Sequence, residues 1–208
     1  MQLFDDEGDY LAFVRVLAAG LERCPQARLI SFCLMPNHWH LVFWPRRGAD
    51  TALSELMRWV GTTHVRRRHE RRHSVGTGPI YQGRFKHFPI QEDEHLLAVC
   101  RYVERNALRA DLVERAEQWR WGSLWLRRQS SGLEDEEQAL QSLLSEGPVP
   151  RPRNWLSLVN KPQTQAELEA LRQSVAKGRP YGASNWSERT AYRLGISLRG
   201  PGRPRKEA

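Results

Sequence analysis

The stretch RLISFCLMPNHWHLVFWP, residues 28–45, constrains the fold more than any other part of the chain. Two apolar runs meet at Pro36-Asn37, and a break of this kind between two strand-forming runs predicts a hairpin. Side chains alternate between the faces of a strand, so His38 and His40 would share one face of the second strand. We therefore expect a rigid hairpin that holds two imidazoles side by side, with Val42 and Trp44 on the histidine face and Trp39, Leu41 and Phe43 on the other.

The two histidines have two interpretations. Imidazoles that share a face one residue apart can occupy two adjacent positions around a divalent metal, and a strand is a precise support for them. They can equally be polar side chains on the outer face of a half-buried hairpin. The local pattern alone does not separate these interpretations.

Size and charge limit the class of the protein. A chain of 208 residues is long enough for one good core and an appendage. The formal charge of +8 indicates an anionic partner, and nucleic acid is favoured over a membrane because no amphipathic anchor accompanies the charge. No segment approaches the roughly 18 apolar residues of a membrane span, and the N-terminus is acidic. We expect a cytoplasmic, nucleoid-associated protein with reduced thiols at Cys24, Cys33 and Cys100.

Two helices are predicted around the hairpin. The first begins near Asp9 as its N-cap, and its apolar stripe consists of Tyr10, Phe13, Val14, Leu17 and Leu21. The second covers residues 51–73, and its stripe of Leu53, Leu56, Met57 and Val60 fades into an arginine-rich end. Residues 58–72 contain six arginines and only one acidic residue, Glu70. Such a cluster is either a solvated basic face or a surface that neutralises phosphates.

Two segments follow this helix. Residues 80–90, IYQGRFKHFPI, predict one or two short strands with a bend at Gly83. Residues 92–106 predict a helix with a core stripe of Leu96, Cys100, Val103 and Ala107. Tyr102 and Asn106 lie together on another face near His95, so Tyr102 is not needed for the core. A tyrosine in such a place is either solvated or chemically active.

The polar, acidic stretch QSSGLEDEEQ predicts a domain boundary, with one domain over residues 1–130 and an appendage over 131–208. The appendage contains a linker, a helix over residues 164–177, a second short helix capped by Ser184 and stopped by Gly195, and a basic tail. The Gly-Arg-Pro of that tail resembles an AT-hook that lies in a minor groove. A disordered basic tail is the alternative description.

Several motifs in one order resemble a known family. The motifs are MPNHWHLVFWP, YQGRF, RYVERNALRADLV followed by WRWGS, and GRPYG with LRGPGRPRK. Together they resemble the single-tyrosine, IS200-like transposases of the histidine-hydrophobic-histidine (HUH) endonuclease superfamily, and within it most closely the REP-associated tyrosine transposases of bacteria. The resemblance implies an α+β fold, namely a ferredoxin-like antiparallel sheet with helices packed on one side, followed by a small helical, basic C-terminal tail.

The resemblance also implies a chemistry. It assigns His38, His40 and Asn106 as metal ligands and Tyr102 as the nucleophile of a metal-dependent, single-stranded DNA endonuclease and strand transferase with a 5′-phosphotyrosine intermediate. An asparagine in place of a third histidine favours Mg²⁺ or Mn²⁺ over Zn²⁺. The implied partners are single-stranded DNA hairpins of REP-like repeats, bound by a monomer or homodimer. Candidate DNA-binding residues are the basic side chains Arg66, Arg67, Arg68, Arg71, Arg72, Arg84, Arg203 and Arg205.

The chain departs from the family pattern in three places. The family's N-terminal strand is expected to be missing, Ala107 replaces a proline and Asp111 replaces a glycine. Two other functions therefore stay open at this point. One is a DNA-hairpin-binding protein that no longer cuts, and the other is a metal hydrolase of RNA or small phosphoesters that uses only the two histidines.

Overall fold

The computed structural model describes residues 2–49, 51–73, 78–83 and 85–198, and the contacts divide the chain into two compact units. Unit 1 comprises Met1–Arg84 and Val99–Pro162, and unit 2 comprises Phe85–Ala98 and Gln163–Ala208. The second stretch of unit 1 contains α6 (Asp135–Ser142), which packs against α1 (Glu7–Arg23). The domain boundary at residue 130 stays a prediction. Within the described ranges, no helix combines the length and the apolar character needed to cross a membrane.

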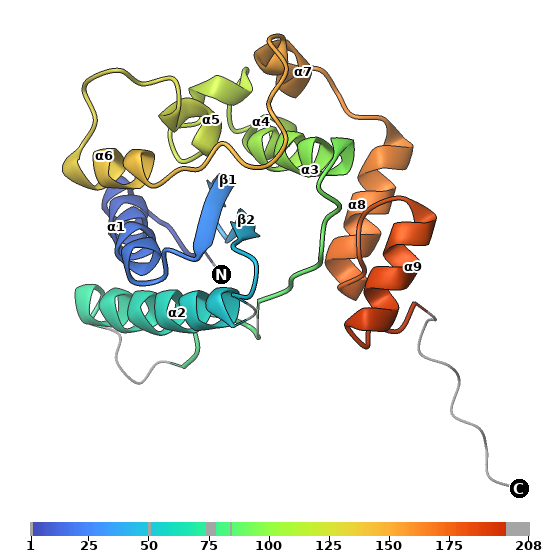
Figure 1. Cartoon of the computed structure of the whole chain (residues 1–208). Coiled ribbons are helices and arrows are strands. Elements are labelled where there is room, and N and C mark those ends of the chain that lie inside the picture. The colour runs from blue at the N-terminus through green and yellow to red at the C-terminus, as the bar shows by residue number, and fades with distance from the viewer. Residues whose placement is uncertain (1, 50, 74–77, 84, 199–208) are drawn as a thin grey trace, which may run out of the picture. The chain divides into compact units, whose positions relative to one another are not determined.

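Unit 1 is built on a hairpin of two antiparallel strands, β1 (Ala27–Met35) and β2 (His38–Pro45). The pairing starts with Met35 opposite His38 at the turn and has one irregularity between Leu29 and Ser31. The predicted hairpin and its turn at Pro36-Asn37 are therefore confirmed. Within unit 1, Figure 1 shows the hairpin between α2 (Ala52–Arg71) and the short helices α4 (Asn106–Arg109) and α5 (Ser123–Leu126).

The two faces of the hairpin contact different helices. Trp39 packs toward α1, where its ring centre lies 6.0 Å from that of Phe13. His40 points the other way, toward Tyr102 of α3 (Glu94–Glu104). The α+β class, with an antiparallel sheet and helices packed against it, is confirmed. Apolar side chains on the histidine face, such as Cys33, are buried as well.

The outer edge of β1 is covered by loops. The Leu34 N–H donates to the carbonyl of Trp121 over 2.8 Å, and the Ser145 N–H donates to the carbonyl of Leu29 over 2.8 Å. The first of these loops leads into α5 (Ser123–Leu126). Within the described residues the sheet thus has two strands, and its backbone groups on this edge are satisfied by short stretches of the later chain.

The predicted helices around the hairpin are present. α1 begins after Asp6, whose carboxylate accepts from the Asp9 N–H over 2.9 Å, so the prediction of Asp9 as the cap is wrong. Asp9 is instead buried, where it pairs with arginines of α2. The predicted apolar stripe of α1 is buried, and α2 buries Leu56, Met57 and Val60.

The chain bends at the end of α3. The helix stops at Glu104, and a short α4 (Asn106–Arg109) follows after Arg105, so the helix predicted over residues 92–106 is confirmed with a break before its last residue. Its predicted core stripe is buried. A 3₁₀ turn, η1 (Ala116–Gln118), and α7 (Trp155–Asn160) complete unit 1.

A buried carboxylate joins these segments. The side chain of Glu104 has no exposed surface and accepts hydrogen bonds from four groups. The donors come from β1, α5, the segment before α7 and α7 itself, namely Ser31 Oγ at 3.2 Å, Ser123 Oγ at 3.0 Å, Arg151 Nη2 at 3.2 Å and Trp155 Nε1 at 2.7 Å. Because the donors come from three separate stretches of the sequence, this carboxylate fixes the end of α3 within unit 1.

Unit 2 contains α8 (Gln165–Lys177), capped by Thr164, and α9 (Ser184–Arg193). Both helices were predicted, and Gly195, with a positive φ of 65°, follows the end of the second as expected. The prediction that Ser184 caps the second helix is wrong, because Ala183 is its N-cap and Ser184 is its first residue. The strands predicted within residues 80–90 are absent from the described part of that segment, where only Ile90 forms an isolated bridge, to Tyr181. Proline at position 89 cannot donate to a ladder, which limits the pairing to this single point.

Candidate functional site

β2 brings the two predicted metal ligands together. The rings of His38 and His40 have centres 4.9 Å apart and meet at 89°. The side-chain oxygen of Asn37 lies 2.6 Å from His38 Nδ1. Because that oxygen accepts, the proton resides on Nδ1 and the lone pair of His38 is on Nε2. The period of the strand predicted this shared face correctly.

Both imidazoles are neutral at pH 7. Partial burial, with a contribution from the positive charge of Arg109, lowers the pKa of His38. Burial, His38 and Arg109 together lower the pKa of His40 to about 4. A neutral imidazole is the form that binds a metal ion, so no proton has to leave before these side chains can act as ligands.

Tyr102 lies beside this pair. Its ring centre is 5.8 Å from that of His40, at an interplanar angle of 82°. The residue is 8% exposed and belongs to the buried set of unit 1, whereas the sequence placed it on a polar face with His95. His95 belongs to unit 2, where its ring lies 5.4 Å from that of Tyr181.

Arg109 is the residue of this site that the sequence analysis missed. Its guanidinium carbon lies 4.1 Å from the ring centre of Tyr102, and Nη2 donates to Asn106 Oδ1. The signal was available, because Arg109 follows Asn106 by three positions and residues so spaced meet on one helical face. The contacts connect His38, His40, Tyr102, Arg109 and Asn106 into one cluster.

Two atoms of this cluster lack a partner. Asn106 Nδ2 and Arg109 Nη1 are buried and form no hydrogen bond with any described residue. A buried polar atom without a hydrogen-bond partner destabilises the folded protein, unless a bound ligand forms that hydrogen bond. Two neutral imidazoles and the amide oxygen of Asn106 could hold a divalent cation, and the free N–H of Arg109 fits an anionic oxygen beside it.

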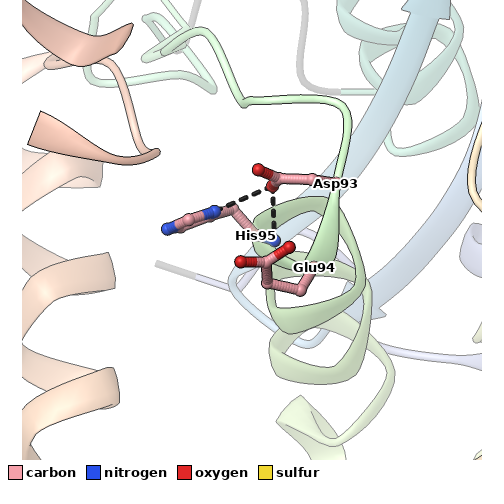
Figure 2. A group of neighbouring side chains, drawn as sticks. All are labelled: Asp93, Glu94 and His95. Carbon is pink, nitrogen blue, oxygen red and sulfur yellow. Dashed lines mark hydrogen bonds and ion pairs between the residues drawn. The ribbon is translucent and has the colours of Figure 1, made fainter. Parts of the chain in front are cut away.

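A different group in unit 2 also combines possible metal ligands. Figure 2 shows Asp93, Glu94 and His95 at the start of α3, with one ligand atom of each within 4.8 Å of the others. Asp93 Oδ1 accepts from the backbone N–H of His95 over 2.9 Å and lies 2.8 Å from its Nδ1. These contacts cap the first turn of α3, which accounts for the arrangement without an ion.

Three of the predicted DNA-binding arginines form ion pairs within unit 1. Arg68 and Arg72 contact Asp5 at 3.3 and 3.1 Å, and Arg71 contacts Asp9 at 2.7 Å. A hydrogen bond from Arg71 lowers the pKa of Asp6. These arginines therefore join the end of α2 to the start of α1, and their role in DNA binding stays a prediction.

The remaining arginines of the list divide into two groups. Arg66 is exposed and lies 3.8 Å from Glu70, and Arg67 forms no ion pair with a described residue. Arg84, Arg203 and Arg205 lie outside the described residues, together with the Gly-Arg-Pro tail.

Comparison with known proteins identifies one family. Residues 4–106 match the model of the family described as "Transposase IS200 like". The matched range contains the hairpin, α1, α2, α3 and, at its last position, Asn106. Neither a curated protein nor a solved structure matches the chain.

Proposed function

Since the chain belongs to the IS200-like transposase family, we propose that it cuts and rejoins single-stranded DNA through a covalent bond to Tyr102. One observation carries the proposal. The phenol ring of α3 lies against His40, 5.8 Å between ring centres, although the two residues are far apart in the sequence. A phenol and a pair of neutral imidazoles therefore lie side by side in unit 1, which supports the proposal.

The metal-binding residues of the proposal are His38, His40 and Asn106. A bound Mg²⁺ or Mn²⁺ would withdraw charge from the scissile phosphate. The histidines are held by β2, and Asn106 is held by α4, so each ligand comes from a packed element. Asn106 Oδ1 is engaged by Arg109, and it would have to exchange that bond for the metal.

Tyr102 is the proposed nucleophile. Its Oη attacks the phosphorus and loses its proton, while the bond from phosphorus to the 3′ oxygen breaks and that oxygen takes up a proton. The products are a 5′-phosphotyrosine and a free 3′-OH. Attack of a 3′-OH on the phosphotyrosine reverses these bond changes, so strands rejoin without a further energy source.

Arg109 completes the proposed site. Its guanidinium lies over the Tyr102 ring, and its buried Nη1 has no partner among the described residues. A phosphate oxygen next to the phenol would accept from this N–H, which is the usual way that arginine binds a phosphate. The cation would also stabilise the developing negative charge on the phenol oxygen.

The substrate follows from the closer resemblance to the REP-associated transposases. We propose that unit 1 acts on single-stranded hairpins of the REP type, as a monomer or homodimer. Membership of a transposase family indicates DNA binding in general. The choice of REP-type hairpins as the substrate is the finer, proposed part.

The test is a covalent complex on a denaturing gel. The protein is incubated with labelled single-stranded hairpin DNA and Mn²⁺, and we expect a labelled band at the size of the protein plus a DNA fragment. Tyr102→Phe and His38→Ala should abolish this band. Tyr192→Phe is the matched control, because Tyr192 is 91% exposed and lies in unit 2.

A DNA-binding protein without cleavage is the second candidate. It is favoured by the hydrogen bond from Arg109, which occupies the oxygen that Asn106 would offer to a metal. Under this function, folded wild-type protein binds the hairpin, Tyr102→Phe binds it equally well, and no covalent complex forms with Mg²⁺ or Mn²⁺.

A further inference from the structure

The surface of α2 is divided into faces with different roles. One face is buried through Leu56 and Val60. A second carries Arg68, Arg71 and Arg72 and pairs with the acidic start of α1. The third follows the positions 55, 58/59, 62/63 and 66/67, a spacing of three and four residues that places them in one row along the helix.

This third face and the end of α1 line an open pocket of about 850 Å³. We name it the arginine pocket after its four basic side chains, Arg23, Arg58, Arg66 and Arg67. At the usual helical rise, the row from residue 55 to residue 67 extends over roughly 18 Å. The pocket is therefore a groove along α2, long enough for several consecutive groups of a polymer.

The charge in this groove is not neutralised by its surroundings. Arg23, Arg58 and Arg67 form no ion pair with a residue that the structure describes, and Arg66 has only a distant contact of 3.8 Å with exposed Glu70. Glu55 is the one acidic residue of the lining. A row of guanidinium groups, most of them without a carboxylate partner among the described residues, matches an anionic chain with regularly spaced phosphates.

An aromatic ring lies among these cations. Trp59 is half-buried and lines the pocket, and the guanidinium of Arg23 lies 5.4 Å from its ring centre. A Cβ at Gly20 would come within 3.2 Å of the Trp59 ring, so the glycine lets α1 approach this side chain closely. A tryptophan fixed beside arginines is the combination on which a nucleic-acid base stacks.

We propose that the arginine pocket binds a single-stranded segment of DNA, with phosphates on Arg58, Arg66 and Arg67 and a base on Trp59. The proposal rests on the proposed function for its choice of DNA as the anion. A single strand is the fitting form because its unpaired bases can turn toward the ring in the groove, whereas the bases of a duplex are stacked inside the helix. The groove lies outside the cluster around Tyr102, so it would hold DNA without taking part in the chemistry.

The test measures DNA binding without cleavage. In a Tyr102→Phe background with EDTA, the affinity for a fluorescent single-stranded oligonucleotide is measured at several salt concentrations. We expect the triple change Arg58→Gln, Arg66→Gln and Arg67→Gln to weaken binding at least tenfold, and to reduce the slope of log K against log salt by about 2. Trp59→Leu should weaken binding to single strands about tenfold and leave binding to a duplex of equal length unchanged.

The matched control removes the same charge elsewhere in unit 1. Arg47, Arg128 and Arg153 are exposed and do not line the pocket, so their triple change to Gln should leave affinity within about twofold apart from the general charge effect. Thermal unfolding of each variant confirms that it is folded. The proposal would be overturned if the pocket variant and the control variant lost the same affinity for DNA. It would also be overturned if Trp59→Leu weakened binding to single strands and to duplexes equally.

The outcomes separate this proposal from the proposed function. If wild-type protein forms the covalent complex but the pocket variants bind DNA normally, the pocket proposal fails and the function stands. If the pocket variants lose affinity but no covalent complex ever forms, the pocket stands and the cleavage function fails.

Discussion

Arg109 lies between the two parts of the candidate site, over the ring of Tyr102 and bonded to Asn106. We predict that Arg109→Gln lowers the rate of covalent-complex formation at saturating DNA roughly 100-fold, since one preorganised donor to developing charge is lost. The affinity for DNA in EDTA should change less than about twofold, because one phosphate contact among many contributes little to binding. Single-turnover gel assays and fluorescence anisotropy measure the two quantities.

Arg109→Lys tests whether charge or geometry is needed. A lysine keeps the cation but not the flat, forked donor group, so we expect only partial recovery of the rate. A loss of rate and affinity in equal proportion would show that Arg109 has only a structural role.

His64 is a buried histidine outside the candidate site. It is 3% exposed, its Nδ1 lies 2.6 Å from the hydroxyl of Tyr81, and that hydroxyl accepts from Trp39 Nε1 over 3.2 Å. Burial lowers the pKa of His64 to about 4 from an unfolded value of 6.5. Neutral His64 therefore does not reduce the stability of the folded protein above pH 6.5. As the pH falls from 6.5 toward 4, the folded protein loses stability, because the imidazole takes up a proton in the unfolded chain but not in the folded one.

We predict that His64→Leu reduces the pH dependence of stability. Between pH 7 and pH 4 the free energy of unfolding of the wild type should fall by roughly 3 kcal/mol more than that of the variant. Urea denaturation at a series of pH values measures the difference. The same slope in both proteins would mean that His64 does not control the acid sensitivity.

The positions of the site residues could be predicted from the sequence only where the period of a strand or helix decides which face a side chain occupies. A period of two puts His38 and His40 on one face, and the structure has them there. Burial of Tyr102 was not predictable, because it depends on packing between segments distant in the sequence. The family pattern has a glycine at the position of Asp111. This residue adopts a positive φ of 54°, a backbone conformation that favours glycine, so the pattern indicated the local conformation correctly.

At the scale of elements, the ends of α1 and α2 are joined by charge. Asp9 is 4% exposed and pairs with Arg71 and Arg72. We predict that Asp9→Asn lowers the free energy of unfolding by about 1–3 kcal/mol, since it leaves two arginines without a buried partner. Asp111→Asn, at an exposed aspartate, should have little effect, and urea denaturation compares the two.

The elements themselves differ in how well the sequence predicted them. The helix α1 was predicted within a few residues because its apolar stripe extends over most of its length. The bounds of α2 were also predicted within two residues, although its stripe covers only the first half of the helix. The strands expected within residues 80–90 were wrong, because alternation cannot show whether a partner strand exists. The sequence also did not predict the two backbone hydrogen bonds on the edge of β1, which join Leu34 to Trp121 and Leu29 to Ser145.

At the scale of the whole molecule, Glu104 connects distant stretches of unit 1. Its carboxylate is bound by Ser31 of the hairpin and by Arg151 and Trp155 near the end of unit 1. We predict that Arg151→Met lowers the free energy of unfolding by about 2–4 kcal/mol, because it leaves a buried charge with only neutral donors. Arg153→Met, at an exposed arginine two residues away, is the control, and a comparable loss in both would contradict the assignment.

The division of unit 1 into two stretches of chain has a consequence for its biosynthesis. The histidine hairpin leaves the ribosome early, but the tyrosine helix and the donors that hold its end emerge only after residues 85–98, with Trp155 last. A nascent chain that has not reached Trp155 lacks the donors that hold the end of α3, and with them the assembled candidate site. We therefore expect the proposed nuclease activity to require synthesis of the chain past Trp155.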